Sequence, residues 1–284
     1  MKKFLLMVVM VLSLGMITGC GSWKMYGTDE RSELHDVIGY VADEQLLLSR
    51  VIGSSLPTRV SDEISSDYTF VDYVSTMDID PTKPVIALTF DDGPVNGNTN
   101  AILDVLEEYG AKATFYMVGD NVGEGTSETL HRMVSIGCEV ANHTQSHAYL
   151  DELDVAGIKE QIGSQNEAIY TYSGRYARTI RPPGGYISDL LKQTVNQPLI
   201  MWSVDTLDWK TRNVDSTFNV ATTQVRDGDI VLMHDIHNET AAAVASIVPE
   251  LSKMGYQMVT VSELAYLKGV KMQAGEVYYD FCDN

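Results

Sequence analysis

Two histidines four positions apart, His143 and His147, are the first residues of this chain with the types and spacing to hold a metal ion. On a helical turn, side chains four residues apart point the same way, so both imidazoles could face one ion. The adjacent carboxylates of Asp91 and Asp92 offer oxygen ligands from another segment. Two imidazoles and one carboxylate leave positions open for water and substrate, which is typical of a catalytic metal rather than a structural one. Zinc suits this set best, and cobalt, nickel or manganese are alternatives.

The two carboxylates can divide the work at such a site. One would bind the metal, while the other stays free as a general base toward water. The run Asp91-Asp92-Gly93-Pro94 is also typical of a plain β-turn, which is the structural alternative. The metal interpretation is favoured because the acids and the histidine pair are expected on one common face.

An arginine and a histidine could serve the same chemistry. Arg181 precedes a run of two prolines and two glycines, which would hold the guanidinium rigidly and expose a backbone N–H to an oxyanion. His234 ends an apolar run, and a nearby carboxylate would keep its imidazole protonated as a general acid. A simple loop and a structural histidine are the respective alternatives.

A fourth group contains the acids Asp205 and Asp208 and the indole of Trp209, directly after the apolar run that ends near Ser203. A capped turn with a packed tryptophan is the structural alternative for it. Together with the groups above, these residues form the densest set of titratable side chains at the ends of predicted strands.

Apolar runs rich in β-forming residues alternate with helical stretches from Pro84 onward. The expected strands are 85–90, 113–118, 139–142, 179–181, 199–203, 230–233 and 257–261. The expected helices are 98–109, 126–136, 152–172, 186–195, 215–225, 239–253 and 262–267. Seven strand–helix units predict an α/β fold with a parallel sheet, most simply a closed or nearly closed barrel, with an open doubly wound sheet as the alternative. In a parallel barrel, the carboxyl ends of the strands carry the active residues.

The N-terminus resembles a secretion signal. Lys2 and Lys3 precede an apolar run over 4–16, which is too short for a comfortable membrane span. We expect residues 1–19 to be a signal peptide and Cys20 to be the lipidated first residue of a bacterial lipoprotein, with an ordinary signal peptide as the alternative. Residues 20–80 are then a lipid-anchored spacer with a possible helix over 31–54, and residues 81–284 form the catalytic domain with a short C-terminal tail.

The composition narrows the class of partner. The chain has 284 residues and a formal net charge of −19, which argues against nucleic acid or a polyanionic polymer. Three cysteines are too few for a disulfide scaffold, and Cys138 and Cys282 are expected to be free thiols. We expect a monomer outside the cytoplasm, tethered to the membrane at the cell surface, with a cell-wall polysaccharide as substrate.

The groups above occur in an order that resembles a known family. The ordered segments are 89–93, the pair at 143 and 147, 181–185, 205–209 and 232–234. Together they resemble the NodB-homology polysaccharide deacetylases, the fourth carbohydrate esterase family, over about residues 82–268. The stretches 113–116 and 205–210 look most like peptidoglycan N-acetylglucosamine deacetylases of Gram-positive bacteria.

The resemblance implies a distorted (β/α) barrel, one divalent metal ion and hydrolysis of an N-acetyl group with release of acetate. By this resemblance, Asp91 is the general base, and Arg181 orients it. Asp92, His143 and His147 are the metal ligands, and the N–H of Gly184 contacts the oxyanion. His234 is the general acid with Asp208 as its charge partner, and Trp209 and Leu232 line the acetyl pocket. Two positions depart from the family pattern: Gly184 stands where an aromatic residue is common, and Cys138 stands where a histidine is common.

Other functions remain open at this stage. The same chemistry could act on chitooligosaccharides, on poly-N-acetylglucosamine or, as an esterase, on acetylated xylan. A catalytically inactive carbohydrate-binding protein and a purely structural metalloprotein are alternatives from other classes. Neither alternative gives Asp91 a role as a base or His234 a role as an acid.

Overall fold

The computed structural model describes residues 79–282, so the predicted signal peptide, Cys20 and the spacer up to residue 78 lie outside the described residues. The strands of the described part are β1 (Val85–Asp91), β2 (Thr114–Met117), β3 (Glu139–Asn142), β4 (Leu199–Ile200), β5 (Val204–Asp205), β6 (Ile230–His234), β7 (Gln257–Val259) and β8 (Val277–Tyr278). Its α-helices are α3 (Asn96–Glu108), α4 (Ser127–Ser135), α5 (Val155–Ser173), α6 (Asp189–Thr194), α7 (Asp208–Thr211), α8 (Val214–Thr223), α9 (Asn238–Lys253) and α10 (Val261–Leu267). Within 79–282, no helix has the length and apolar character needed to cross a membrane.

The strands pair in parallel, as predicted. The main sheet has the order β3-β2-β1-β6-β5, and β7 pairs with the first half of β1. Single parallel bridges at Ile180 connect β3 to β4, and β4 pairs with β8. No ladder between described residues joins β5 to β8, but an isolated antiparallel bridge between Asp229 and Asp280 connects the segments next to β6 and β8. The arrangement is a parallel α/β fold.

Alternation along β1 and β6 separates two faces of the sheet. Ile86, Leu88 and Phe90 belong to the core between the sheet and α3, α4, α8 and α9. Val85 and Ala87 belong to a second core on the opposite face, which α10 covers. Because side chains alternate along a strand, Thr89 and Asp91 continue this second face toward the carboxyl end. The face is therefore apolar at one end and polar at the other.

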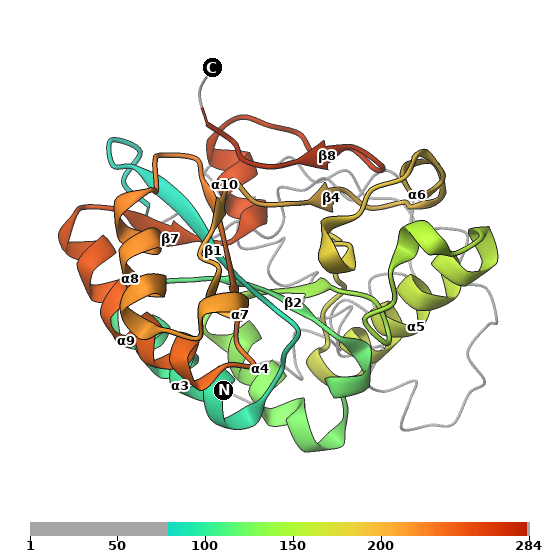
Figure 1. Cartoon of the computed structure of the whole chain (residues 1–284), viewed down its shortest axis with the longest axis horizontal. Coiled ribbons are helices and arrows are strands. Elements are labelled where there is room, and N and C mark those ends of the chain that lie inside the picture. The colour runs from blue at the N-terminus through green and yellow to red at the C-terminus, as the bar shows by residue number, and fades with distance from the viewer. Residues whose placement is uncertain (1–78, 283–284) are drawn as a thin grey trace, which may run out of the picture. The chain divides into compact units, whose positions relative to one another are not determined.

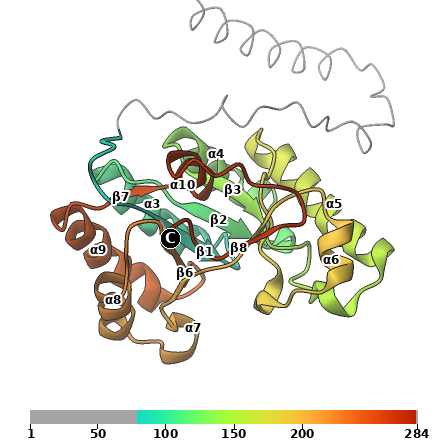
Figure 2. The ribbon, with the colours of Figure 1, turned by 90° about the horizontal axis from the view of Figure 1, so that it is seen from above.

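The helices lie in two groups around the strands. In both views, α8 and α9 are neighbours on one side of the strands, and α5 and α6 lie on the other side (Figure 1, Figure 2). The colours of Figure 1 also show β8, from the end of the chain, beside β4. Helix α5 begins where the Asp154 carboxylate accepts a hydrogen bond from the N–H of Gly157, and it ends at the left-handed Gly174.

The structure corrects several predicted elements. The strand expected over 199–203 is only two residues long (β4), with a further strand, β5, directly after it, and the strand expected over 179–181 is reduced to bridges at Ile180. The backbone carbonyls of Ile200 and Met201 accept hydrogen bonds from the Arg181 side chain, at the point where β4 ends. The strand expected over 257–261 stops at Val259, because Thr260 caps α10. The sequence analysis missed β8 and α7.

The remaining expectations hold closely. β3 has the predicted bounds, β1 and β6 are each one residue longer at their carboxyl ends, and β2 is one residue shorter at each end. The seven predicted helices are all present within a few residues of their expected bounds. Cys138 and Cys282 are free, as expected.

Candidate active site

Three side chains converge at the carboxyl end of the sheet. Nε2 of His143 lies 3.3 Å and Nε2 of His147 lies 3.2 Å from Oδ1 of Asp92. One ligand atom from each residue lies within 4.8 Å of the other two. The Asp92 oxygen is buried and accepts no hydrogen bond from a described residue. A buried, unpartnered carboxylate oxygen between two imidazole nitrogens is the donor set that zinc and similar divalent ions bind.

The tautomer of His143 follows from its second contact. Its Nδ1 lies 2.7 Å from the backbone carbonyl of Arg181. A carbonyl oxygen only accepts, so Nδ1 of His143 carries a proton, and Nε2 is the nitrogen that faces Asp92. This contact fixes the ring orientation in the way that second partners of metal-binding histidines do.

The electrostatics of the three residues favour a bound cation. Burial disfavours the charged form of Asp92, but the imidazoles of His143 and His147 outweigh it and hold the pKa of Asp92 well below its ordinary value. The Asp92 carboxylate in turn raises the pKa of His147. A proton and a metal ion therefore compete for one site, and metal affinity is expected to fall as the pH falls.

The histidine pair does not lie on a helical turn, contrary to our expectation. Residues 143–147 form a loop after β3, and Thr144 and His147 have positive φ angles of 68° and 58°. Helix α5 holds this loop, since Gln161 accepts hydrogen bonds from the N–H of Gln145 and the N–H of Ser146. The two rings meet because the backbone reverses, not because of helical spacing.

Asp91 lies beside this cluster and is held by a buried arginine. Nη1 of Arg181 donates to Oδ1 of Asp91 at 2.6 Å and to the hydroxyl of Thr89 at 2.8 Å. The guanidinium also stacks over the Tyr116 ring at 4.2 Å, and Arg181 is fully buried. The other Asp91 oxygen lies 3.7 Å from Nε2 of His143. Arg181 therefore fixes one oxygen of Asp91 and leaves the other facing the metal ligands.

His234 completes the site from the adjacent strand. It pairs in register with Asp91, and its Nδ1 lies 2.9 Å from Oδ1 of Asp208. Burial alone would lower the pKa of His234, but the hydrogen bond to Asp208 and the nearby carboxylates raise it to about 8. Burial is likewise outweighed at Asp208, whose pKa is lowered by the bonds from His234 and Thr240. The imidazole therefore tends to be cationic near neutral pH.

The three pocket residues lie around this centre in different ways. Leu232 is buried two residues before His234, in register with Thr89. Trp209 follows Asp208 on α7 and is exposed. Gly184 has a φ of 67° and lies beneath the rings of Tyr149 and Tyr186. The structure thus gathers the predicted residues at one edge of the sheet.

Sequence reasoning missed several supporting residues. Thr240 donates to Asp208, and Gln161 anchors the histidine loop. Asp235 is buried, accepts from Thr99 at 2.5 Å and lies so close to Gly93 that a Cβ there would come within 2.3 Å of its oxygens. Burial raises the pKa of Asp235 to about 7. None of these has a local sequence signal, since each acts on a residue distant along the chain.

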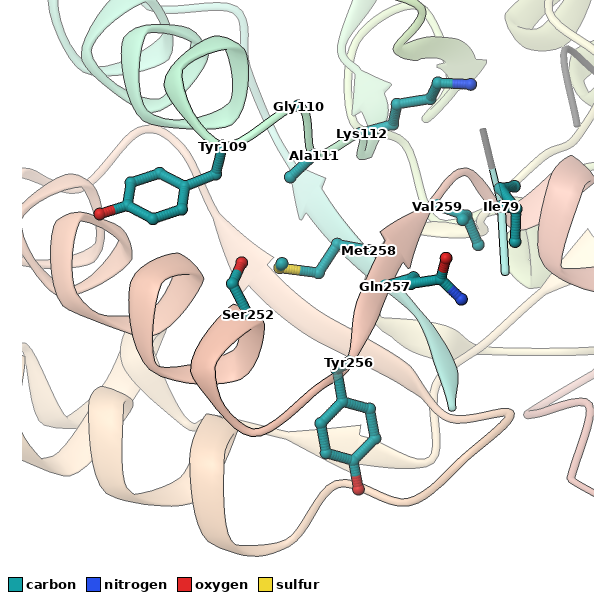
Figure 3. Close-up of a pocket in the computed structure, with 10 residues that line it drawn as sticks. All are labelled: Ile79, Tyr109, Gly110, Ala111, Lys112, Ser252, Tyr256, Gln257, Met258 and Val259. Carbon is teal, nitrogen blue, oxygen red and sulfur yellow. The ribbon is translucent and has the colours of Figure 1, made fainter. Parts of the chain in front are cut away.

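A pocket of about 310 Å³ lies elsewhere, at the amino-terminal ends of β2 and β7 (Figure 3). It is lined by residues 109–112 and 256–259, together with Ile79 and Ser252, and none of the predicted site residues contributes to it. Figure 3 shows Tyr109 and Tyr256 at its margins. The pocket contains no cluster of potential metal ligands, so the chemistry is assigned to the opposite edge of the sheet.

Comparison with known proteins agrees with this geometry. A family model described as polysaccharide deacetylase matches residues 78–198. The chain is 42% identical over 190 residues to the peptidoglycan-N-acetylmuramic acid deacetylase PdaC of Bacillus subtilis, covering 67% of this chain and 40% of that protein. It is 36% identical over 201 residues to a peptidoglycan-N-acetylglucosamine deacetylase of Bacillus cereus, covering 68% of this chain and 93% of that protein.

A solved structure shows the same likeness. A family 4 acetyl xylan esterase from Clostridium thermocellum, in complex with a cobalt ion, superposes with a TM-score of 0.66 at 34% identity, covering 69% of this chain and 98% of that one. The chain spans about two fifths of the length of PdaC. The ordered motifs, the parallel fold and these matches agree: the chain belongs to the polysaccharide deacetylase family.

Proposed function

We propose that this protein hydrolyses the N-acetyl group of N-acetylglucosamine units in a polysaccharide, most simply peptidoglycan, and releases acetate. One observation carries the proposal. The metal-ligand cluster of Asp92, His143 and His147 lies between a carboxylate held by arginine and a histidine held by aspartate. A binding protein or a structural metal site has no need for this separate base and acid.

Asp92, His143 and His147 would hold one divalent ion, with zinc as the favoured metal and cobalt, nickel or manganese as alternatives. Such an ion supplies Lewis acidity, which makes an acetamide carbonyl more electrophilic and a water molecule easier to deprotonate. Asp91 accepts the proton of that water through the oxygen that Arg181 leaves free. The bond from Arg181 also fixes the position of Asp91, so little motion is needed for the transfer.

His234 acts at the other end of the reaction. Its Nδ1–H is held by Asp208, so Nε2 is the nitrogen that can donate a proton to the departing sugar amine. The raised pKa of His234 keeps that proton in place at neutral pH. The backbone N–H of Gly184 would stabilise the developing oxyanion, and Trp209 and Leu232 would enclose the acetyl methyl group.

The cell wall is the proposed substrate because the relatives described above are named as peptidoglycan deacetylases. The basic and apolar N-terminal run and Cys20 support a secreted lipoprotein at the cell surface, with residues 20–80 as its spacer. An N-terminal lipid would keep the enzyme near the wall. A chitooligosaccharide deacetylase and an acetylxylan esterase are the alternatives with the same chemistry.

The direct test is acetate release by the full chain after chelation and metal replacement. Oligomers of N-acetylglucosamine, N-acetylated peptidoglycan and acetylated xylan are offered in parallel, with zinc or cobalt restored. Metal-dependent acetate from an amide-linked substrate, highest on peptidoglycan, is expected. Preference for xylan would reassign the protein as an esterase, and stoichiometric metal without acetate from any substrate would favour a carbohydrate-binding protein. The matched control variant is His131→Ala, because that histidine lies on α4 away from the cluster.

A further inference from the structure

Two tyrosine rings continue outward from the metal-ligand cluster. The Tyr149 ring lies 6.1 Å from the ring of His147, and the Tyr186 ring lies 5.4 Å from that of Tyr149 at an interplanar angle of 88°. Both contacts have the edge-to-face geometry that aromatic pairs favour. His147, Tyr149 and Tyr186 therefore form one row of rings that starts at a proposed metal ligand.

Gly184 makes room for this row. A Cβ at Gly184 would lie 2.7 Å from the ring of Tyr186 and 3.0 Å from the ring of Tyr149. The φ of 67° at Gly184 is also one that side chains rarely adopt. The space that a side chain at position 184 would enter is thus already filled by the rings of Tyr186, two positions along, and Tyr149, from the loop after β3. The two rings can occupy this position only because residue 184 is a glycine.

The two rings are presented to solvent. Tyr149 is 43% exposed and Tyr186 is 54% exposed. Among residues 79–282, neither hydroxyl has a hydrogen-bond partner. An exposed aromatic pair with free hydroxyls offers both an apolar face and a polar edge, and this combination suits a ligand with apolar C–H faces and many hydroxyl groups.

We propose that Tyr149 and Tyr186 form a sugar-binding subsite for the ring next to the one whose acetamide reaches the metal site. This inference rests on the proposed function. Its occupant is a neighbouring hexosamine of the same polysaccharide, because the row of rings begins at His147, passes Gly184 and ends at the exposed Tyr186. The subsite would favour longer chains over the shortest one that is cleaved.

The test compares substrate lengths rather than absolute rates. The ratio of kcat/KM for a pentamer of N-acetylglucosamine to that for a dimer is measured with the zinc-loaded full chain. Tyr186→Ala is the main variant because Tyr186 does not contact a metal ligand in the row of rings. We expect its ratio to fall about tenfold, the size of effect that loss of one well-packed aromatic contact brings. Tyr186→Phe should keep most of the ratio, because it retains the ring.

Tyr109→Ala is the matched control, because Tyr109 is also 43% exposed but lies at the opposite end of the sheet beside the pocket of Figure 3. Its ratio should equal that of the parent protein. A parent-like ratio in folded Tyr186→Ala and Tyr149→Ala variants would overturn the subsite while leaving the deacetylase in place. If the parent releases no acetate from any sugar, the proposed function fails. Calorimetric binding of the pentamer then decides the subsite, which stands if Tyr186→Ala weakens binding and falls if it does not.

Discussion

At the scale of single residues, the site depends on pairs in which one side chain sets the state of another. Arg181 orients Asp91, and the Arg181 carbonyl fixes the tautomer of His143. Asp208 fixes the His234 ring through Nδ1, and the hydroxyl of Thr240 donates a hydrogen bond to the other oxygen of Asp208. Each pair leaves one polar atom directed at the centre, and this explains why neighbouring residues of the same type can differ in function.

Asp91 and Asp92 illustrate that difference and can be separated by mutation. Asp91→Asn should retain bound zinc but lose about 10²–10⁴ in kcat, because an amide cannot accept the water's proton. Asp92→Ala should lose the metal itself, because its oxygen is the carboxylate member of the ligand cluster. Zinc content after dialysis and acetate release on the same samples check both. Full zinc in Asp92→Ala would refute the ligand set, and undiminished kcat in Asp91→Asn would refute the base.

The charge of His234 gives a second prediction. In chelator-treated protein, NMR titration of the His234 ring should give a pKa of about 8, and Asp208→Asn should lower it because the carboxylate that favours the cation is removed. The raised pKa adds to the free energy of unfolding below about pH 6.5, and this contribution disappears as the pH rises through about 8. An unchanged pKa in Asp208→Asn would show that Asp208 does not hold the proton.

At the scale of elements, the carboxyl ends of β1, β3 and β6 carry the proposed site residues, while loops set the angles of their side chains. Asp92 and His147 both have positive φ, so the backbone turns directly at two proposed ligands. The loop that carries His147 is held by helix α5. Gln161 of that helix accepts hydrogen bonds from the backbone N–H groups of Gln145 and Ser146. The position of the proposed ligand His147 therefore depends on the packing of α5.

Gln161→Ala tests that connection. Loss of the side-chain oxygen frees the N–H of Ser146 and loosens the histidine loop, so zinc affinity should fall by about tenfold, the lower end of the range for supporting residues of metal sites. A zinc competition assay with a chromophoric chelator measures the change. Gln193→Ala, at an exposed position of α6, is the matched control and should bind zinc like the parent. Equal affinity in both variants would show that the loop holds its shape without α5.

At the scale of the whole molecule, Arg181 connects the site to the fold. Its side chain reaches Thr89 and Asp91 of β1, the carbonyl of Ile200 in β4 and the ring of Tyr116 in β2. A fully buried guanidinium is tolerated because these partners satisfy it, and its removal would leave the Asp91 carboxylate buried without a cation.

Arg181→Met should therefore lower the free energy of unfolding by about 3–5 kcal/mol. The double variant Arg181→Met with Asp91→Asn should recover part of that loss, because the unpaired charge is gone. Urea unfolding of both variants in the presence of chelator measures the difference. If the double variant is no more stable than the single one, the cost comes from packing and not from the uncompensated carboxylate.

Much of this protein could be predicted from its sequence because the relevant patterns are local. The succession of apolar runs and helical stretches predicted a parallel α/β fold, and polar residues after apolar runs marked the edge where Asp91, Asp92 and His234 lie. The ordered motifs predicted the family. These features depend on residue types within a few positions of each other, which short-range backbone geometry determines.

Only the tertiary structure decided the rest. It replaced the expected helical turn at 143–147 by a loop, shortened the strand expected over 199–203 to two residues, and placed Tyr149 and Tyr186 over Gly184. It also made the Arg181 carbonyl the partner of His143. Most of these outcomes involve segments remote in the chain, such as the contact between His143 and the Arg181 carbonyl across 38 positions. Such contacts have no local signature, because the fold brings the two partners together only after the strands have paired.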